Sequence, residues 1–172
     1  MTKLITGEQF KERLRRSRHA FHLELRDSYR VEEEDIPFAK WMRGEPDDYE
    51  WRREWLSFTR EVTTAGTKIE RARVVTEPIS DYTRWLLTLD PQNIEAGEEI
   101  RYLPRHLATG IDFPAEDCWL FDNHELLLSL FKPDGRSAGF AIEEDPALVA
   151  RYRAVHDAVW TRAIPYAEYV SK

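Results

Sequence analysis

The sequence feature that most constrains the fold is the stretch DCWLFDNHELLLSLF at residues 117–131. Five mostly apolar residues are followed by the polar break Asp122-Asn123-His124 and then by a second apolar-rich run. Short apolar runs on either side of turn-forming residues are typical of two core strands joined by a tight turn. The stretch therefore predicts a core hairpin, and Cys118 within it is expected to be a buried, unreactive thiol.

The segments after the hairpin continue this pattern. Lys132-Pro133-Asp134-Gly135 is a turn signal, and residues 136–142 are predicted to form a third strand in a meander. Asp145-Pro146 supplies an N-cap and a proline at the first position of a long amphipathic helix, which Pro165 ends. We therefore expect three strands and one covering helix in the C-terminal part.

A strand, a helix and another strand precede the hairpin. Residues 68–76 alternate between charged and apolar side chains, and 99–103 form the second strand. The helix between them is predicted to start at Ser80, with an interruption at Asp90-Pro91. Two strands connected through a helix favour a parallel pair, so residues 67–172 predict an α/β core, a mixed sheet flanked by helices.

Residues 1–66 are expected to be a mainly helical region packed on this core, within one compact domain. Thr6 caps a short first helix, the acidic run at 32–35 opens a second, and an aromatic stripe at helical spacing marks a third. From Ala20 the period changes to two, which predicts a half-buried strand, while a first helix continuing to Leu25 is the alternative.

The charge of the chain argues against a general nucleic-acid binder. The 172 residues carry a formal net charge of −7, whereas such binders normally have a net basic surface. The basic run at 11–18 is interpreted as a solvated helix face because no aromatic side chain is interleaved for base stacking. No signal peptide and no apolar run of about 18 residues occur, so neither secretion nor a membrane span is indicated and the cytoplasm is expected.

None of the common catalytic or metal-binding motifs is complete in the sequence. His22 and Glu24 have the His-x-Glu spacing of zinc deaminases, but that chemistry needs a pair of cysteines and the chain has one Cys. His19 and His22 could share a helix face, yet a metal site needs further ligands. Phosphate-binding glycine motifs and the nucleophile elbow are also missing. We therefore predict no catalytic residue, no metal and no cofactor.

Arginines, including Arg71 and Arg105, gather on or beside the expected central strands. Guanidinium groups near carboxylates either form internal ion pairs, which we favour, or bind an anion. A crevice is expected where the parallel strands end, near Pro78 and Pro104. The candidate ligand-binding residues, chosen by charge and by place in this pattern, are Arg73, Tyr82, Arg84, Arg101, Asp117 and Asp122.

Five segments carry a resemblance to a known family. They are HLELRDSY at 22–29, RARVVTEPISDYTRW at 71–85, AGEEIRYLPR at 96–105, DCWLFDN at 117–123 and DAVWTRAIP at 157–165. On these segments the chain resembles an uncharacterised actinobacterial family of unknown function, encoded beside helix-turn-helix regulators of the Xre type. The resemblance implies no activity, but it implies a role in transcriptional regulation and a helix-turn-helix protein as a partner.

The order of elements from Arg71 onward, ending in a strand pair, a turn and a helix with Val159-Trp160 near its end, is similar to one half of the phospholipase D-like fold. Active members carry His-x-Lys-x-x-x-x-Asp with the histidine as nucleophile. With Asp122 at the motif aspartate, Ala115 stands at the histidine position and Asp117 at the lysine position. The resemblance implies a degenerate half-domain with an N-terminal helical extension, in which that catalysis is lost and both aspartates are structural.

Two functions are consistent with these observations. The first is a non-catalytic accessory or sensor module for a transcriptional regulator, binding a small anionic effector or a helix-turn-helix partner. The alternative is a divergent phosphodiesterase-like hydrolase that uses His106 or His124. A homodimer formed through the helix around Trp160 or through a sheet edge is a further expectation.

Overall fold

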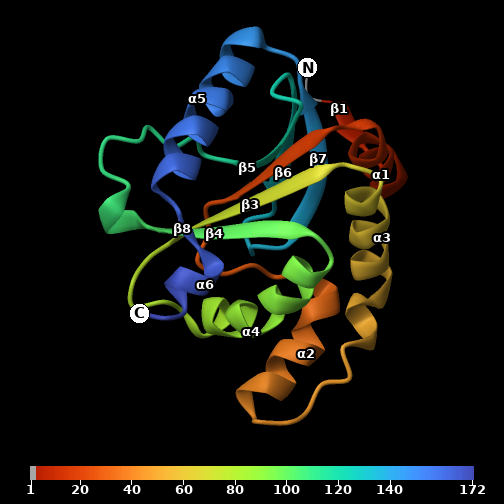
Figure 1. Cartoon of the computed structure of the whole chain (residues 1–172), viewed down its shortest axis with the longest axis vertical. Coiled ribbons are helices and arrows are strands. Elements are labelled where there is room, and N and C mark those ends of the chain that lie inside the picture. The colour runs from red at the N-terminus through yellow and green to blue at the C-terminus, as the bar shows by residue number, and fades with distance from the viewer. Residues whose placement is uncertain (1–2) are drawn as a thin grey trace.

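A mixed sheet runs through the molecule and carries helices on both faces (Figure 1). The structure, a computed structural model, describes residues 3–172, and within them the sheet has eight strands in the order β1-β7-β6-β5-β2-β3-β4-β8. In this part of the chain no helix is long and apolar enough to cross a membrane.

The strands are β1 (Lys3–Ile5), β2 (His19–Glu24), β3 (Lys68–Val75), β4 (Glu98–Pro104), β5 (Asp117–Phe121), β6 (Glu125–Phe131), β7 (Ser137–Glu143) and β8 (Ile164–Pro165). The helices are α1 (Gly7–Arg16), α2 (Glu32–Met42), α3 (Arg53–Thr64), α4 (Asp81–Glu95), α5 (Pro146–Arg162) and α6 (Tyr166–Tyr169), with 3₁₀ turns η1 (Glu50–Arg52) and η2 (Arg105–Leu107).

The predicted hairpin is confirmed. β5 and β6 pair in antiparallel fashion, with Asp117 opposite Ser129. Asp122 and Asn123 in the connecting turn both have positive φ, 49° and 61°, as tight turns that match the twist of the strands require. β7 pairs with β6 to give the expected meander, and β1 adds an edge strand that the sequence pattern did not indicate.

Parallel pairing builds the other half of the sheet. β3 lies between β2 and β4 and runs parallel to both, so the parallel pair predicted from the strand-helix-strand order is confirmed. α1 ends at Arg16 and β2 begins at His19, so the alternative of a first helix continuing to Leu25 is wrong. Because β1 and β2 belong to the common sheet, residues 1–66 contribute strands as well as helices and share one sheet with residues 67–172.

α5 covers one face of the sheet (Figure 1). Tyr152, Val155 and Val159 of this helix are buried in one apolar cluster with Phe21 and Leu23 of β2. The three helix residues recur at helical spacing, so the apolar stripe expected from the sequence is the side of α5 that contacts the sheet.

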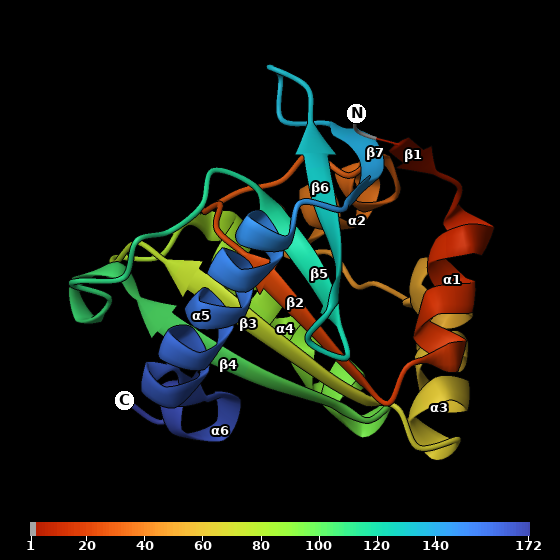
Figure 2. The same cartoon turned by 90° about the horizontal axis from the view of Figure 1, so that it is seen from above.

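The opposite face is covered in two places. α1 and α3 lie side by side at one end of it, and α2 packs on α4 elsewhere (Figures 1 and 2). Phe10 of α1 and Val62 of α3 bury Ala20 and Ile69, which stand near the starts of β2 and β3. Farther along the same two strands, the side chains on this face are polar, and the candidate site lies there.

α4 is one continuous helix, so the interruption expected at Asp90-Pro91 is wrong. Proline has no backbone N–H, which leaves the carbonyl of Leu87 without its usual partner inside the helix. The hydroxyl of Tyr166 donates to that carbonyl at 2.9 Å. The replacement hydrogen bond comes from a distant part of the chain, and for that reason local sequence could not reveal it.

Candidate functional site

A cavity of about 570 Å³ opens on the sheet face opposite α5. Its floor comes from the central strands β2, β3, β5 and β6, and its walls come mainly from α1 to α4 and the segments before α2 and α3. Aromatic side chains contribute much of the wall, among them Phe10, Trp51, Trp55 and Tyr82. The volume lies in the range of roughly 300–1,000 Å³ that is usual for small-molecule sites.

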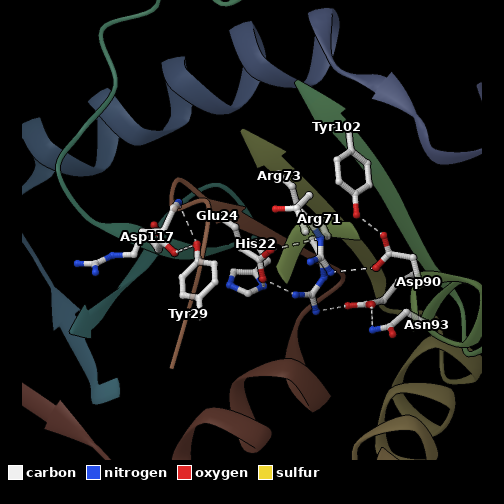
Figure 3. Close-up of polar contacts among 12 residues, drawn as sticks. His22, Glu24, Tyr29, Arg71, Arg73, Asp90, Asn93, Tyr102 and Asp117 are labelled. Carbon is white, nitrogen blue, oxygen red and sulfur yellow. Dashed lines mark hydrogen bonds and ion pairs between the residues drawn. The ribbon is translucent and has the colours of Figure 1, made fainter. Parts of the chain in front are cut away.

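Strand alternation directs polar side chains into this cavity. In the parallel register of β2 and β3, His22 lies beside Arg71 and Glu24 lies beside Arg73, so the four form one patch (Figure 3). Successive side chains of a strand point to opposite faces, and the intervening Leu23 is accordingly buried against α5. The same strands therefore present polar side chains to the cavity and apolar side chains to α5.

The guanidinium groups on the floor are held by buried carboxyl groups. Arg71 donates to Glu24 at 2.7 Å and to Glu98 at 2.9 Å, and Arg73 donates to Asp90 at 3.0 Å. Burial alone would raise the pKa of Glu24, but the two arginines outweigh it and lower that pKa to about 2. The internal ion pairs that we favoured for the arginines are thus present at Arg71 and Arg73.

Two further carboxyl groups of the cavity are hydrogen-bonded to tyrosines. The hydroxyl of Tyr29 donates to Asp117, and the hydroxyl of Tyr82 donates to Glu34 at 2.6 Å. Burial raises the pKa of Asp117 to about 6, and it also raises the pKa of Glu34. Asp117 therefore changes its charge closer to neutral pH than an ordinary aspartate does.

His22 is stacked on Trp119, with the ring centroids 4.2 Å apart. Burial, followed by the positive charge of Arg71, lowers the pKa of His22 to about 3. The imidazole is therefore neutral at physiological pH and offers one hydrogen-bond donor and one acceptor.

Several polar atoms buried in the floor have no hydrogen-bond partner among residues 3–172. Leaving such an atom unsatisfied costs about 1–3 kcal/mol. These atoms are buried, so a polar ligand or an ordered water would satisfy them only after a shift of the side chains around them. The atoms without any such contact are Arg71 Nε, His22 Nδ1 and Ser129 Oγ, whereas Arg73 Nε and Glu24 Oε2 lie 3.4 Å from each other as an ion pair.

Three of the six predicted ligand-binding residues line the cavity. Arg73 contributes to its floor from β3, Tyr82 stands in the wall from α4, and Asp117 comes from the start of β5. These three come from separate elements, which the sheet order brings together.

The other three predicted residues lie elsewhere. Arg84 is exposed on α4 and pairs with Asp81. Arg101 lies on the α5 face, 4.1 Å from the ring of Trp160, because it is one residue out of phase with the cavity-facing side of its strand. Asp122 accepts two backbone N–H groups at the hairpin turn, at 3.0 and 2.9 Å.

Some cavity residues were not among the candidates. For Glu24 a signal existed, since a charged residue alternates with apolar ones in a strand that lies inside the sheet. For Tyr29 no local signal existed, because it lies in a loop and meets Asp117, 88 residues away. The missed residues used below are His22, Glu24, Tyr29, Asp90 and Ser129.

A second polar cluster lies on the α5 face. Nε2 of His19 and Nε2 of His156 lie 2.8 and 3.1 Å from Oε2 of Glu70. The three ligating atoms are all within 4.8 Å of one another, close enough to bind a single metal ion. The cluster of His19, Glu70 and His156 could not be recognised as a sequence motif, because 51 and 86 residues separate Glu70 from its two partners.

The fold is an α/β fold, in which residues 3–172 form an eight-stranded mixed sheet with helices on both faces (Figure 1). The chain is similar to the crystal structure of a phospholipase D family member, Nuc, from Salmonella typhimurium, with a TM-score of 0.51 and 10% sequence identity. The match covers 96% of this chain and 99% of that chain. The likeness expected from Arg71 onward thus extends over nearly the whole length, and at this identity it concerns the fold alone.

The chain belongs to the DUF6879 family, a domain of unknown function, which matches residues 8–171. No protein with curated annotation matches the chain.

Proposed function

We propose that this protein is a non-catalytic sensor module that binds a small polar molecule in the cavity opposite α5. The observation that carries the proposal is the cavity floor, where buried polar atoms of His22, Arg71 and Ser129 find no hydrogen-bond partner within residues 3–172. Apolar walls around a few precisely placed polar groups are typical of small-molecule sites.

The charges around the cavity favour an uncharged or zwitterionic ligand over the anionic effector expected from the sequence. The buried arginines of the cavity are matched in number by buried carboxyl groups, so an incoming anion meets no surplus of positive charge. Asp117 and Glu34 add only further acidic groups. Arg71 and Arg73 pair with Glu24, Asp90 and Glu98. The third buried arginine, Arg52, donates to oxygens of Leu89, Gln92 and Asn93.

The walls favour a ligand with a flat ring. Trp51, Trp55 and Tyr82 line the cavity. Phe10 lines it too, but its ring is stacked on Phe140 and Trp55, with centroids 4.8 and 6.4 Å away. Aromatic faces of this kind pack well against planar heterocycles, while the donors and acceptors of the floor can bind the polar edge of such a ring. A small neutral heterocycle is therefore the ligand class that we propose.

The likeness to the phospholipase D fold supports binding without that family's catalysis. Ala115, which stands where the resemblance places the nucleophilic histidine, is an exposed residue in the bend before β5. Alanine offers no nucleophilic atom. His106 in η2 and His124 in the hairpin turn lie outside the lining of the cavity.

A hydrolase remains the second candidate, because His22 does line the cavity. Its neutral imidazole lies beside Arg71 on the cavity floor. Hydrolysis of a chromogenic phosphodiester by the wild type and its loss in His22→Gln would favour the hydrolase over the sensor. Equal background rates in both proteins would leave the sensor as the better assignment.

We also propose that the module acts in the cytoplasm beside a helix-turn-helix regulator. The support is the sequence resemblance to a family encoded next to such regulators. Co-purification of the two proteins, with ligand present and absent, tests this part. Failure to co-purify under both conditions would remove the regulator as the partner while leaving the ligand site intact.

Ligand binding can be tested by thermal shift with a panel of neutral heterocycles, zwitterions and anionic metabolites. We expect a rise in Tm with neutral heterocycles and weaker binding, by roughly three- to tenfold, in Ser129→Ala, because one hydrogen bond to the floor is lost. Ser57→Ala, an exposed position on α3, is the matched control and should bind as the wild type does. No response to any compound, or equal affinity in Ser129→Ala and a bulky Ser129→Leu, would contradict the proposal.

A further inference from the structure

Three metal-ligating side chains meet on the sheet face away from the cavity. His19 is the first residue of β2, Glu70 points from β3, and His156 points from α5 toward the sheet. The side chain of Glu70 is 4% exposed, that of His156 12% and that of His19 22%. The cluster is therefore almost dry but can be reached from solvent on the side of His19.

The spacing of the ligating atoms suits a tetrahedral metal ion. With metal–ligand bonds of about 2.0–2.1 Å, two ligands of a tetrahedral zinc site are roughly 3.3 Å apart. Glu70 Oε2 lies 2.8 Å from His19 Nε2 and 3.1 Å from His156 Nε2. Outward shifts of a few tenths of an ångström would bring Glu70 to the required separation from both histidines, whose ligating nitrogens lie within 4.8 Å of each other.

The surrounding contacts orient two of the ligands. Nδ1 of His156 is 3.1 Å from Oδ1 of Asp157, so this ring has a carboxylate on one nitrogen and directs the other nitrogen toward Glu70. A carboxylate behind a histidine in this manner is typical of metal ligands, because it fixes the tautomer and the ring orientation. Lys68 pairs with Oε1 of Glu70 at 2.9 Å, which leaves Oε2 for a metal ion.

We propose that His19, Glu70 and His156 bind one divalent transition-metal ion of the zinc class, with water as a fourth ligand. Two imidazoles and one carboxylate favour zinc, iron or nickel over magnesium and calcium, which prefer all-oxygen sites. Through its three protein ligands, the ion links α5 to β2 and β3. The site is independent of the cavity, which lies on the other face of the same strands.

Titration calorimetry with Zn²⁺ on chelator-treated protein tests the proposal. We expect one equivalent of Zn²⁺ to bind, the Tm to rise, and Co²⁺ in its place to give the visible absorption of a tetrahedral site. His156→Gln, Glu70→Gln and His19→Gln should each lose more than about a hundredfold in affinity, and Asp157→Asn about 10–100-fold.

The controls are His106→Gln and His124→Gln, which change histidines outside the cluster and should bind Zn²⁺ as the wild type does. Circular dichroism of each variant separates loss of binding from loss of folding, and His19→Gln, at the most exposed of the three positions, is the variant expected to disturb the fold least. No uptake of Zn²⁺ or Co²⁺ by the wild type would overturn the proposal and leave a hydrogen-bonded triad. Equal uptake by all three ligand variants would overturn it too.

Discussion

Arg71 and Glu24 form a buried ion pair between two parallel strands, with Nη1 of Arg71 2.7 Å from Oε1 of Glu24. Each has a second charged neighbour, since Arg71 pairs with Glu98 at 2.9 Å and Glu24 lies 3.4 Å from Arg73. The resulting chain of charges ties β2, β3 and β4 together on the cavity side. These ion pairs therefore fix the positions of the charged side chains in the cavity floor.

Glu24→Gln should destabilise the protein by about 3–5 kcal/mol, because it leaves two buried arginines without a shared carboxylate. The pKa of Glu24 is lowered from 4.5 to about 2, so its contribution is present above pH 4.5 and is lost as the pH falls through 2. Urea unfolding at neutral and acidic pH measures both effects. Asp81→Asn, which breaks the exposed pair with Arg84, should cost at most about 1 kcal/mol. A loss for Glu24→Gln no larger than this control would contradict the prediction.

Asp117→Asn should make the protein more stable above pH 6. The pKa of Asp117 is raised from 3.8 to about 6, so the folded state holds this proton more tightly, and the stability that it gives is lost as the pH rises through that range. At about 1.4 kcal/mol per pKa unit, the variant gains roughly 3 kcal/mol above pH 6 and little below pH 4.

The measurement for Asp117→Asn is the free energy of unfolding as a function of pH. Asp112→Asn, at an exposed position, is the control and should follow the wild type throughout. A variant less stable than the wild type at pH 8 would show that the carboxylate is needed in its charged form.

Gly97→Ala should cost about 1–3 kcal/mol, because the backbone there has φ of +108° and a Cβ would lie 2.6 Å from Cβ of Thr63. Thr63 also donates to the carbonyl of Ala96 at 2.7 Å, so its side chain is not free to move away. Thermal unfolding compares this variant with Gly7→Ala, where no described atom lies within 4 Å of an added Cβ. Gly7→Ala should be neutral or slightly stabilising, and equal Tm values for the two variants would refute the steric account.

Cys118 should resist thiol reagents in the native protein. It is 1% exposed and burial raises the pKa of its thiol, so the reactive thiolate is scarce and inaccessible. Labelling with a chromogenic disulfide should proceed only as the protein unfolds, and a cysteine placed at exposed Ser57 should react at once. Rapid labelling of Cys118 under native conditions would show that β5 opens locally.

Local elements were determined by the sequence alone, because they depend on near neighbours. The turn at Asp122-Asn123, the cap at Thr6 and the stripe of α5 each need only a few adjacent residues, and the structure has all three. The sequence also predicted the meander and the parallel pair of strands, because short connections restrict the order of strands in a sheet. A mixed α/β sheet could therefore be expected before the tertiary structure was known, whereas its phospholipase D-like character was expected only from the resemblance.

Which polar residues face one another was decided only by the tertiary structure. Arg73 and Arg101 look alike in sequence, yet strand phase directs one to the cavity and the other to Trp160. Tyr29 reaches Asp117 because β2 pairs with β5, a choice made by the packing free energy of the whole sheet. Sites assembled from distant segments have no local signature, whereas helices, turns and hairpins do. The hairpin at 117–131 shows both, since the sequence determined its strands and the surrounding sheet determined what its first aspartate contacts.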